Sequence, residues 1–136
     1  MSGLVRSLTA SGLVGRGGLK SKIKIGQRTG ATGSGTETVT GVGFAPLAML
    51  IWANFDSATD DASWGFGDSG NSSESLYAGQ ATTTFNDSPD FLIVLDAGTV
   101  HYWTASLTSL DSDGCTMEFV ENGTAADMSY FILFLG

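Results

Sequence analysis

The stretch Val100-His-Tyr-Trp-Thr-Ala-Ser-Leu-Thr-Ser-Leu-Asp-Ser-Asp-Gly-Cys-Thr-Met-Glu-Phe-Val120 decides the fold of this chain. In residues 100–107 and again in 115–120, two sets of side chains alternate with a period of two, which is the pattern of a half-buried β-strand. Between them, Asp113-Gly114 readily adopts the positive backbone φ of a tight hairpin turn. The stretch therefore predicts two strands joined by a turn.

The same pattern continues on both sides of this stretch. Further strands are predicted at 38–40, 47–52, 63–66, 75–85, 91–95 and 130–135, with turns at 96–98 and 122–123. The run Leu47-Ala-Met-Leu-Ile-Trp52 is apolar throughout, which is typical of a strand covered on both faces. Roughly seven to nine short strands at a spacing of about 8–12 residues predict an all-β fold, an antiparallel β-sandwich or a jelly roll.

Composition supports this class. The chain has 136 residues, about one domain, and 19 of them are glycine. Each glycine inside a helix costs about 0.5–1 kcal/mol relative to alanine, so the glycine content argues against an all-α fold. No apolar run reaches the roughly 18–20 residues that span a bilayer. Because Gly12, Gly15 and Gly17 interrupt the apolar residues near the start, we expect neither membrane insertion nor a signal peptide.

Charge is divided sharply along the chain. All six basic residues lie within the first 28 positions, and all 14 carboxylates lie between Glu37 and Asp127. The basic part is rich in glycine and contains no aromatic residue, since the first is Phe44. We therefore predict an extended N-terminal arm and linker at 1–35, followed by an acidic β-sandwich domain at 36–136.

Within the arm, residues 20–25 alternate with the period of a strand, and residues 29–36 are expected to be a flexible connector. The cations of the arm are predicted to bind a partner, with a merely solubilising leader as the alternative. These cations are Arg6, Arg16, Lys20, Lys22, Lys24 and Arg28.

Catalytic chemistry has little support in the sequence. The only histidine, His101, has no Gly-x-Ser-x-Gly motif or reactive cysteine to serve, and we expect it to be structural. Cys115 has no basic residue near it in sequence and is expected to be a small buried apolar residue. Several loop carboxylates could form the acidic pair of a glycosidase, but aspartate is also a common turn former. They are Asp60, Asp61, Asp68, Asp87 and Asp90.

The prediction is therefore a protein that is no enzyme, with no catalytic residue, no cofactor and no metal site. Weak Ca²⁺ binding by the acidic loops is the open alternative. The segment that begins at Asp111 fails as an EF-hand loop, since its glycine comes at the fourth position and Asn122 occupies the twelfth.

One segment carries a resemblance to a known family. Thr40-Gly-Val-Gly-Phe44-Ala-Pro46, followed by Met49-Leu-Ile-Trp52, resembles a module of virion proteins of tailed bacteriophages. In that module a Gly-Phe-x-Pro turn leads into a buried strand that ends in Trp. Residues 111–119 and 125–136 are similar to its Asp-Gly hairpin strand and its closing strand. The resemblance implies a β-sandwich on the virion surface, in capsid decoration or in tail fibres, and carries over no catalytic residue.

These observations predict a structural virion protein, namely a capsid decoration or cement protein. Its basic arm would bind the major capsid protein or another virion subunit. The alternative is a tail-fibre or receptor-binding module that recognises a host-surface glycan through exposed aromatic residues, for which the candidates are Trp64, Tyr102 and Trp103. The same aromatics would otherwise pack in the core.

The division of charge also bears on assembly. Arms that cross between subunits would bring basic segments against acidic domains, so we predict a homo-oligomer, with a trimer as the first choice. We do not expect nucleic acid as a partner, because the acidic domain repels a phosphate backbone.

Overall fold

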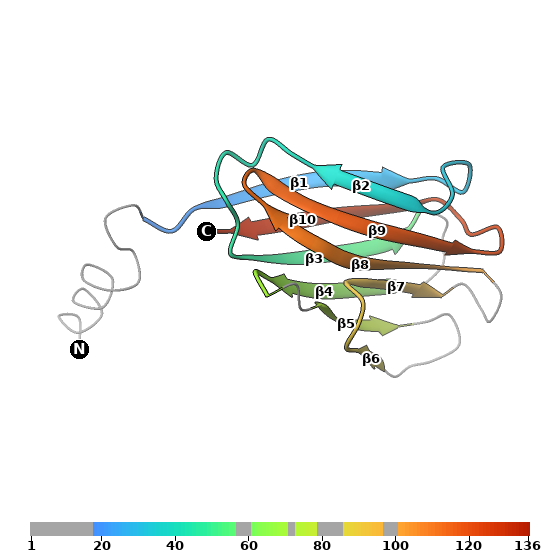
Figure 1. Cartoon of the computed structure of the whole chain (residues 1–136). Helices are drawn as coiled ribbons and strands as arrows, with labels where there is room; N and C mark the ends of the chain where they lie inside the picture. Colours follow the sequence, from blue (N-terminus) through green and yellow to red (C-terminus); the bar gives the residue numbers. More distant parts are fainter. Residues whose placement is uncertain (1–17, 57–60, 71–72, 79–85, 97–100) are drawn as a thin grey trace.

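The computed structural model describes residues 18–56, 61–70, 73–78, 86–96 and 101–136. Within these ranges the chain forms ten β-strands and no helix (Figure 1). The strands are β1 (Ser21–Arg28), β2 (Gly35–Val39), β3 (Ala48–Phe55), β4 (Ala62–Asp68), β5 (Ser73–Ala78), β6 (Asn86–Ser88), β7 (Ile93–Asp96), β8 (Tyr102–Asp111), β9 (Gly114–Asn122) and β10 (Met128–Leu135).

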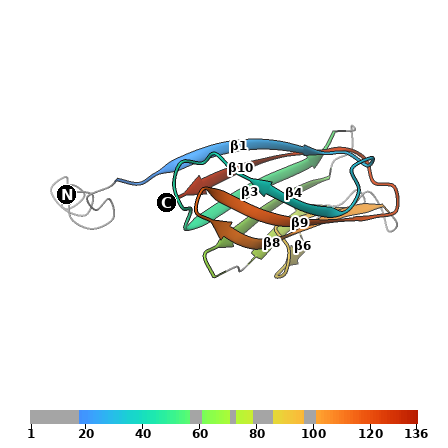
Figure 2. The same cartoon turned by 45° about the horizontal axis from the view of Figure 1, so that its top comes forward.

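The strands form two antiparallel sheets that lie face to face. The six-stranded sheet has the order β1-β10-β3-β4-β5-β6, and the four-stranded sheet has the order β2-β9-β8-β7. Figures 1 and 2 show the two layers from two directions. Both sheets contain runs of consecutive neighbours, β3 to β6 and β7 to β9. The predicted all-β fold is confirmed, and its architecture is that of a β-sandwich.

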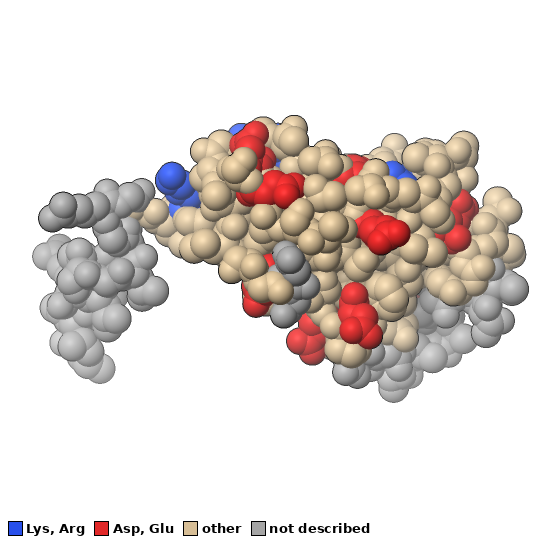
Figure 3. Space-filling view, in the orientation of Figure 1, with Lys and Arg blue, Asp and Glu red and all other residues tan. Residues whose placement is uncertain are grey.

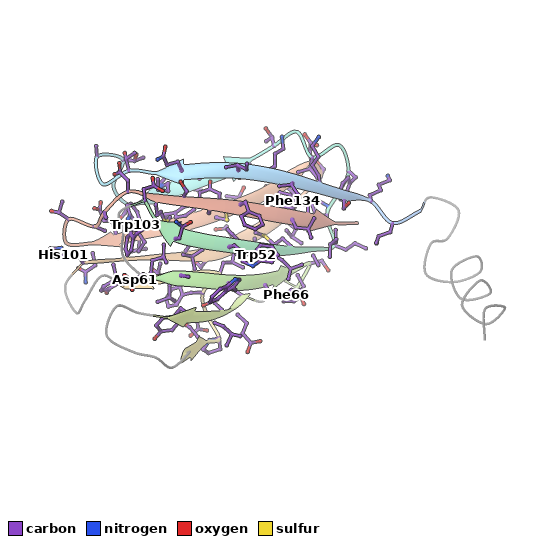
Figure 4. All side chains as sticks on the ribbon, turned by 180° about the vertical axis from the view of Figure 1, so that it is seen from behind. Trp52, Asp61, Phe66, His101, Trp103 and Phe134 are labelled. Atoms are coloured by element: carbon purple, nitrogen blue, oxygen red, sulfur yellow. The ribbon has the colours of Figure 1, made fainter. Side chains whose placement is uncertain are left out.

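The core lies between the sheets, and strand alternation builds it. On β3 the inward side chains Met49, Ile51 and Phe55 are buried, and the other strands contribute in the same way. Trp103 of β8 and Phe134 of β10, labelled in Figure 4, are fully buried in this core. The period of two read from the sequence therefore corresponds to one side of each strand facing the opposite sheet.

Two glycines are required by close approaches, one between the two sheets and one between neighbouring strands of the six-stranded sheet. A Cβ on Gly65 of β4 would lie 1.9 Å from the carbonyl oxygen of Leu92, which comes just before β7. A Cβ on Gly26 of β1 would lie 2.2 Å from the ring of Tyr130. Glycine within a strand commonly marks such a close approach. At these two positions the absence of a Cβ leaves room for the Leu92 carbonyl and for the Tyr130 ring.

The loop that carries the family resemblance is held by the predicted β8–β9 turn. The Asp113 carboxylate accepts hydrogen bonds from the backbone N–H of Gly41 at 2.8 Å and of Gly43 at 2.5 Å. Both glycines have positive φ, 77° and 85°, which favours a residue without a Cβ. The two bonds, that from Gly43 foremost, lower the pKa of Asp113. The glycines of Thr40-Gly-Val-Gly-Phe44 thus wrap the chain around one carboxylate.

The predicted domain boundary at residue 35 needs correction. β1 pairs with β10 along its whole length, from Ser21 to Arg28, so this part of the predicted arm is an edge strand of the sandwich. The expected connector at 29–36 is a hydrogen-bonded turn that leads into β2, with the Gly30 N–H donating to Asp127. Pairing with β10 supplies the backbone hydrogen bonds that offset the cost of ordering these residues. Residues 1–17 lie outside the described part of the chain.

Other predicted elements agree in position and differ in length. β5 covers the beginning of the strand predicted at 75–85, and residues 79–85 lie outside the described part of the chain. Of the turn predicted at 96–98, residues 97 and 98 also lie outside the described part of the chain. His101 was expected within a strand and instead lies in a bend just before β8.

Candidate functional site

Large apolar side chains cover the outward side of the six-stranded sheet. The register places one from each of five strands in a row: Ile25, Phe131, Trp52, Trp64 and Leu76. The neighbouring row contains Ile23, Leu133, Leu50 and Phe66. We call these nine residues the apolar face. Figure 4 looks onto this sheet, with Trp52 and Phe66 labelled on adjacent strands.

The apolar face is open to solvent and nearly free of charge. Six of its side chains are exposed, from 37% for Trp64 to 81% for Ile25, and the other three are half-buried. Among the described outward side chains of these five strands, the charged ones are Asp68 and Glu74, which lie at one corner. The expectation that residues 47–52 are covered on both faces is wrong, because the described part of the chain covers the inward face of β3 and leaves Leu50 and Trp52 half-buried on the outward face.

The surface of the apolar face has shallow hollows between its side chains. One of about 350 Å³ is lined by the apolar side chains Leu50, Trp64, Phe66 and Leu76, with Glu74 and Ser75 at the β5 edge. Two more, of about 190 Å³ each, open on either side of Phe131. The Phe131 ring stacks on Trp52, with centroids 4.6 Å apart and planes 10° from parallel. Such a surface can bind another apolar surface whose side chains enter the hollows.

A second candidate surface is the end of the sandwich where the N-terminal segment enters. Lys20 and Lys22 are exposed there, and Lys24 is half-buried. Lys20 also bonds through its backbone to the last residue, Gly136, so both ends of the described chain meet at this point. In Figure 3 the largest cationic patch lies at this end, and carboxylates are spread over the rest of the visible face. Arg6 and Arg16 lie outside the described residues.

Arg28 does not belong to this basic surface. Its side chain is buried, with Nη1 3.4 Å from a Glu37 carboxylate oxygen and Nη2 donating to the Gly33 carbonyl at 2.8 Å. The guanidinium also lies 4.7 Å from the ring centroid of Phe119. The Tyr130 hydroxyl donates to the other Glu37 oxygen. The prediction that Arg28 binds a partner is therefore wrong, since the residue joins β1 to β2 inside the protein.

The three candidate glycan-facing aromatics lie in three different environments. Trp64 belongs to the apolar face. Trp103 is fully buried and its indole N–H donates to the Ala126 carbonyl at 2.9 Å, so its predicted role in glycan binding is wrong. Tyr102 is half-buried and lines a hollow of about 270 Å³ together with Tyr77, Phe91 and the hydroxyl-bearing Ser88 and Thr104.

His101 and Cys115 take no part in a catalytic arrangement with each other. His101 is exposed, and its Nδ1 accepts a hydrogen bond from the Thr124 N–H at 3.0 Å. Cys115 is fully buried, as predicted. Burial, followed by the charges of Asp111 and Glu37, raises the pKa of its thiol to about 12, which suppresses the reactive thiolate.

Two of the candidate acidic residues, Asp61 and Asp68, lie far apart on the fold. Asp61 is buried just before β4, and Asp68 lies at the other end of the same strand. At about 3.3 Å per residue they are roughly 20 Å apart, beyond the separations of roughly 5–10 Å that glycosidases use. Asp90 is exposed, Asp60 lies outside the described residues, and the side chain of Asp87 is not described.

The Asp111 carboxylate, considered for Ca²⁺, accepts hydrogen bonds from Ser109 and Thr116. Within the described residues, no three His, Cys, Asp or Glu side chains are grouped so that they could hold a metal ion. The same residues contain no helix of the length and hydropathy that crossing a membrane requires.

No protein-family model, no curated protein and no solved structure matches this chain.

Sequence reasoning missed most of the apolar face, including Phe66, Leu76 and Phe131. A signal was present, since 47–52 and 130–135 are apolar at both alternating positions. For residues 47–52 this signal predicts a strand buried on both faces. The pattern does not say whether the second face is buried by this chain or by another molecule.

Proposed function

We propose that this chain is a structural protein of a bacteriophage-type virion, a decoration or cement protein that docks on an acidic surface of a neighbouring subunit. Docking occurs through the end of the sandwich from which the N-terminal segment leaves. The resemblance of residues 40–52 to virion modules supplies the class of particle. The function is one of assembly and involves no catalysis.

The observation that carries this proposal is the group of three lysines at the end of the fold where the described chain begins, although the Asp113 carboxylate lies near Lys24. Lys20, Lys22 and Lys24 lie together on and just before β1, directly after the segment that contains Arg6 and Arg16. All carboxylates come later in the chain, from Glu37 onward. A molecule polarised in this way is steered so that its basic end meets an acidic surface. Arg28 is excluded from the docking set because it is buried.

The proposal is tested by measuring how much protein is incorporated into virions. A variant in which Arg6, Arg16, Lys20, Lys22 and Lys24 are all replaced with Gln should show reduced occupancy relative to the major capsid protein. Salt should weaken binding of the wild-type protein, because the screening length falls from about 8 Å at 0.15 M to about 3 Å at 1 M. A variant with the three lysines changed to arginine keeps the charge and serves as the control. Unchanged occupancy of the Gln variant would contradict charge-driven docking.

Copy number separates decoration from a tail part. Quantitative mass spectrometry of purified virions should find hundreds of copies for a decoration protein, whereas a dozen or fewer would place the protein in the tail.

A specific observation favours the tail-fibre alternative as a second candidate. The hollow beside Tyr102 combines two tyrosine rings, Tyr77 and Tyr102, with the hydroxyl groups of Ser88 and Thr104. Aromatic rings and polar groups together are suited to the apolar faces and hydroxyls of a sugar. Binding of host-surface polysaccharide that is lost in Tyr102→Ala and retained in Tyr102→Phe would support this function. Equal binding by the wild-type protein, Tyr102→Ala and Tyr102→Phe would exclude a glycan site at this hollow.

A further inference from the structure

We propose that the apolar face binds the same face of a second copy of this chain, so that two six-stranded sheets stack in a twofold dimer. This inference goes beyond docking on a particle, because it concerns a different surface and predicts association of the isolated protein.

The two central strands of this face, β3 and β10, have the composition of strands that are buried on both sides. On β3 and β10, inward and outward positions alike carry large apolar side chains, such as Ile51 beside Trp52 and Ile132 beside Phe131. Antiparallel sheets with one wet face normally alternate apolar and polar residues. Here the opposite sheet covers one side only, and the outward side chains remain open to solvent.

The extent of the face fits a stable pair of copies. Its six exposed side chains leave roughly 600 Å² of apolar surface in water, as large as the largest patches on ordinary monomers. Two such faces bury roughly 1,200 Å² together, the lower bound for specific protein interfaces, before the three half-buried residues are counted. The stacked pair Trp52 and Phe131 lies in the central row, where aromatic side chains contribute most to binding.

The scarcity of charge on the apolar face permits a second copy as the occupant. The protein carries a net charge of −8, and the outward charges of this sheet, Asp68 and Glu74, lie at its corner. Contact through the apolar face therefore keeps the acidic surfaces of two copies apart. A lipid surface would require cations all around the face, whereas its described cations lie along the β1 edge alone. A sugar would require several hydrogen-bonding groups within the rows, whereas the one charged side chain there is Glu74, at the β5 edge. Two identical faces match each other without further requirements.

Symmetry gives the arrangement. A flat patch that contacts its own copy makes an isologous interface, which closes after two subunits. Sheets stacked in this way lie about 10 Å apart, with side chains from both entering the hollows of the other. The hollow of about 350 Å³ between Trp64, Phe66 and Leu76 is large enough to receive such a side chain.

The test is sedimentation equilibrium of the full-length chain and of two variants chosen as a matched pair. Phe66 on the apolar face and Val120 on the outward side of β9 are each 43% exposed. The wild-type protein and Val120→Glu should both reach the mass of a dimer at micromolar concentration. Phe66→Glu should raise the dissociation constant at least about 100-fold, because two carboxylates would enter an apolar interface.

A measurement without substitutions guards against misfolding of a variant. On dilution of the wild-type protein, tryptophan emission should shift to longer wavelength with the same midpoint as the loss of dimer mass, because Trp52 and Trp64 become wet. A monomeric wild-type protein at 100-fold higher concentration would overturn the proposal. So would a trimer, or equal association of Phe66→Glu and wild type when both are folded by circular dichroism. These outcomes concern the isolated protein, so they can fail or succeed independently of the measurement of incorporation into virions.

Discussion

The outward sides of the two sheets differ more than any other regions of this molecule. Across the six-stranded sheet the rows contain Ile, Leu, Phe and Trp. Across the four-stranded sheet one row contains Thr36, Glu118 and Ser106, and the next joins Thr38 to Thr116 through their hydroxyl groups at 3.2 Å. The second pattern is that of an antiparallel sheet with one wet face. The first pattern is typical of a sheet whose outward face is buried against another surface.

This difference teaches that one chain can form a complete core and still leave a second apolar layer unused. The buried side chains between the sheets form a single cluster with contributions from both layers. The apolar face adds nothing to that cluster, since its side chains point the other way. We infer that the folding of the monomer depends on the inner layer and that its assembly depends on the outer one.

The largest effect is expected from paired substitutions on the two sides of β3. Ile51→Ala should lower the free energy of unfolding by about 3–4 kcal/mol, because Ile51 is fully buried and its removal leaves a cavity. Leu50→Ala should lower it by only about 1 kcal/mol, because Leu50 is half-exposed on the outward side. Urea denaturation at low protein concentration measures both. Equal losses would show that the outward side is already covered within the monomer.

The next effect concerns the contact that joins the two sheets at the β1–β2 edge. Arg28→Ala should lower the free energy of unfolding by about 2–3 kcal/mol, because it leaves the Glu37 carboxylate without its buried cation. Lys22→Ala on the same strand should change it by less than about 0.5 kcal/mol, since Lys22 is exposed. Denaturation followed by circular dichroism compares the two. A stable Arg28→Ala variant would mean that β1 contributes little to the sandwich.

A smaller effect is expected at the end of the four-stranded sheet, where Asp113 holds the loop that contains Gly41 and Gly43. The pKa of Asp113 is lowered in the folded protein, so its stabilising contribution is fully present at neutral pH. It is lost as the pH falls below the ordinary value of 3.8 and through the lowered pKa. Asp113→Asn should therefore be less stable than wild type at pH 7, and the difference should shrink in acid. A difference independent of pH would exclude a role for the carboxylate charge.

The last prediction is chemical and concerns Cys115, which lies on the inward side of the four-stranded sheet. With its pKa raised to about 12, the thiol in the native protein should react with a disulfide reagent at pH 8 at least about 1000-fold more slowly than in guanidinium chloride. Spectrophotometry of the released thiolate follows the reaction. Rapid reaction in the native state would indicate that the four-stranded sheet opens readily, and the contrast between a tight inner layer and an open outer face would fail.

The sequence predicted much of the fold and less of the surfaces. The predicted turn within residues 111–114 and the burial of Cys115 are confirmed, with Ser112 and Asp113 forming the turn and Gly114 beginning β9. Both follow from local rules, namely turn propensity and strand alternation. Of the two environments predicted for Trp103, the structure shows the core, and the partner-binding role predicted for Arg28 is wrong. Residue type alone does not say which aromatic enters the core or which cation finds a buried partner.

By itself, the sequence determined the β class, the approximate positions of the strands and the division between basic and acidic parts. These depend on residue type and on a period of two, which are local properties. Only the tertiary structure decided that β1 joins the sandwich, that Arg28 binds Glu37 beneath it, and which side of β3 and β10 stays open. The physical reason is that the alternation of side chains tells which residues share a face of a strand. It does not tell what packs against that face. What packs there depends on which strands pair and on how far the second sheet reaches.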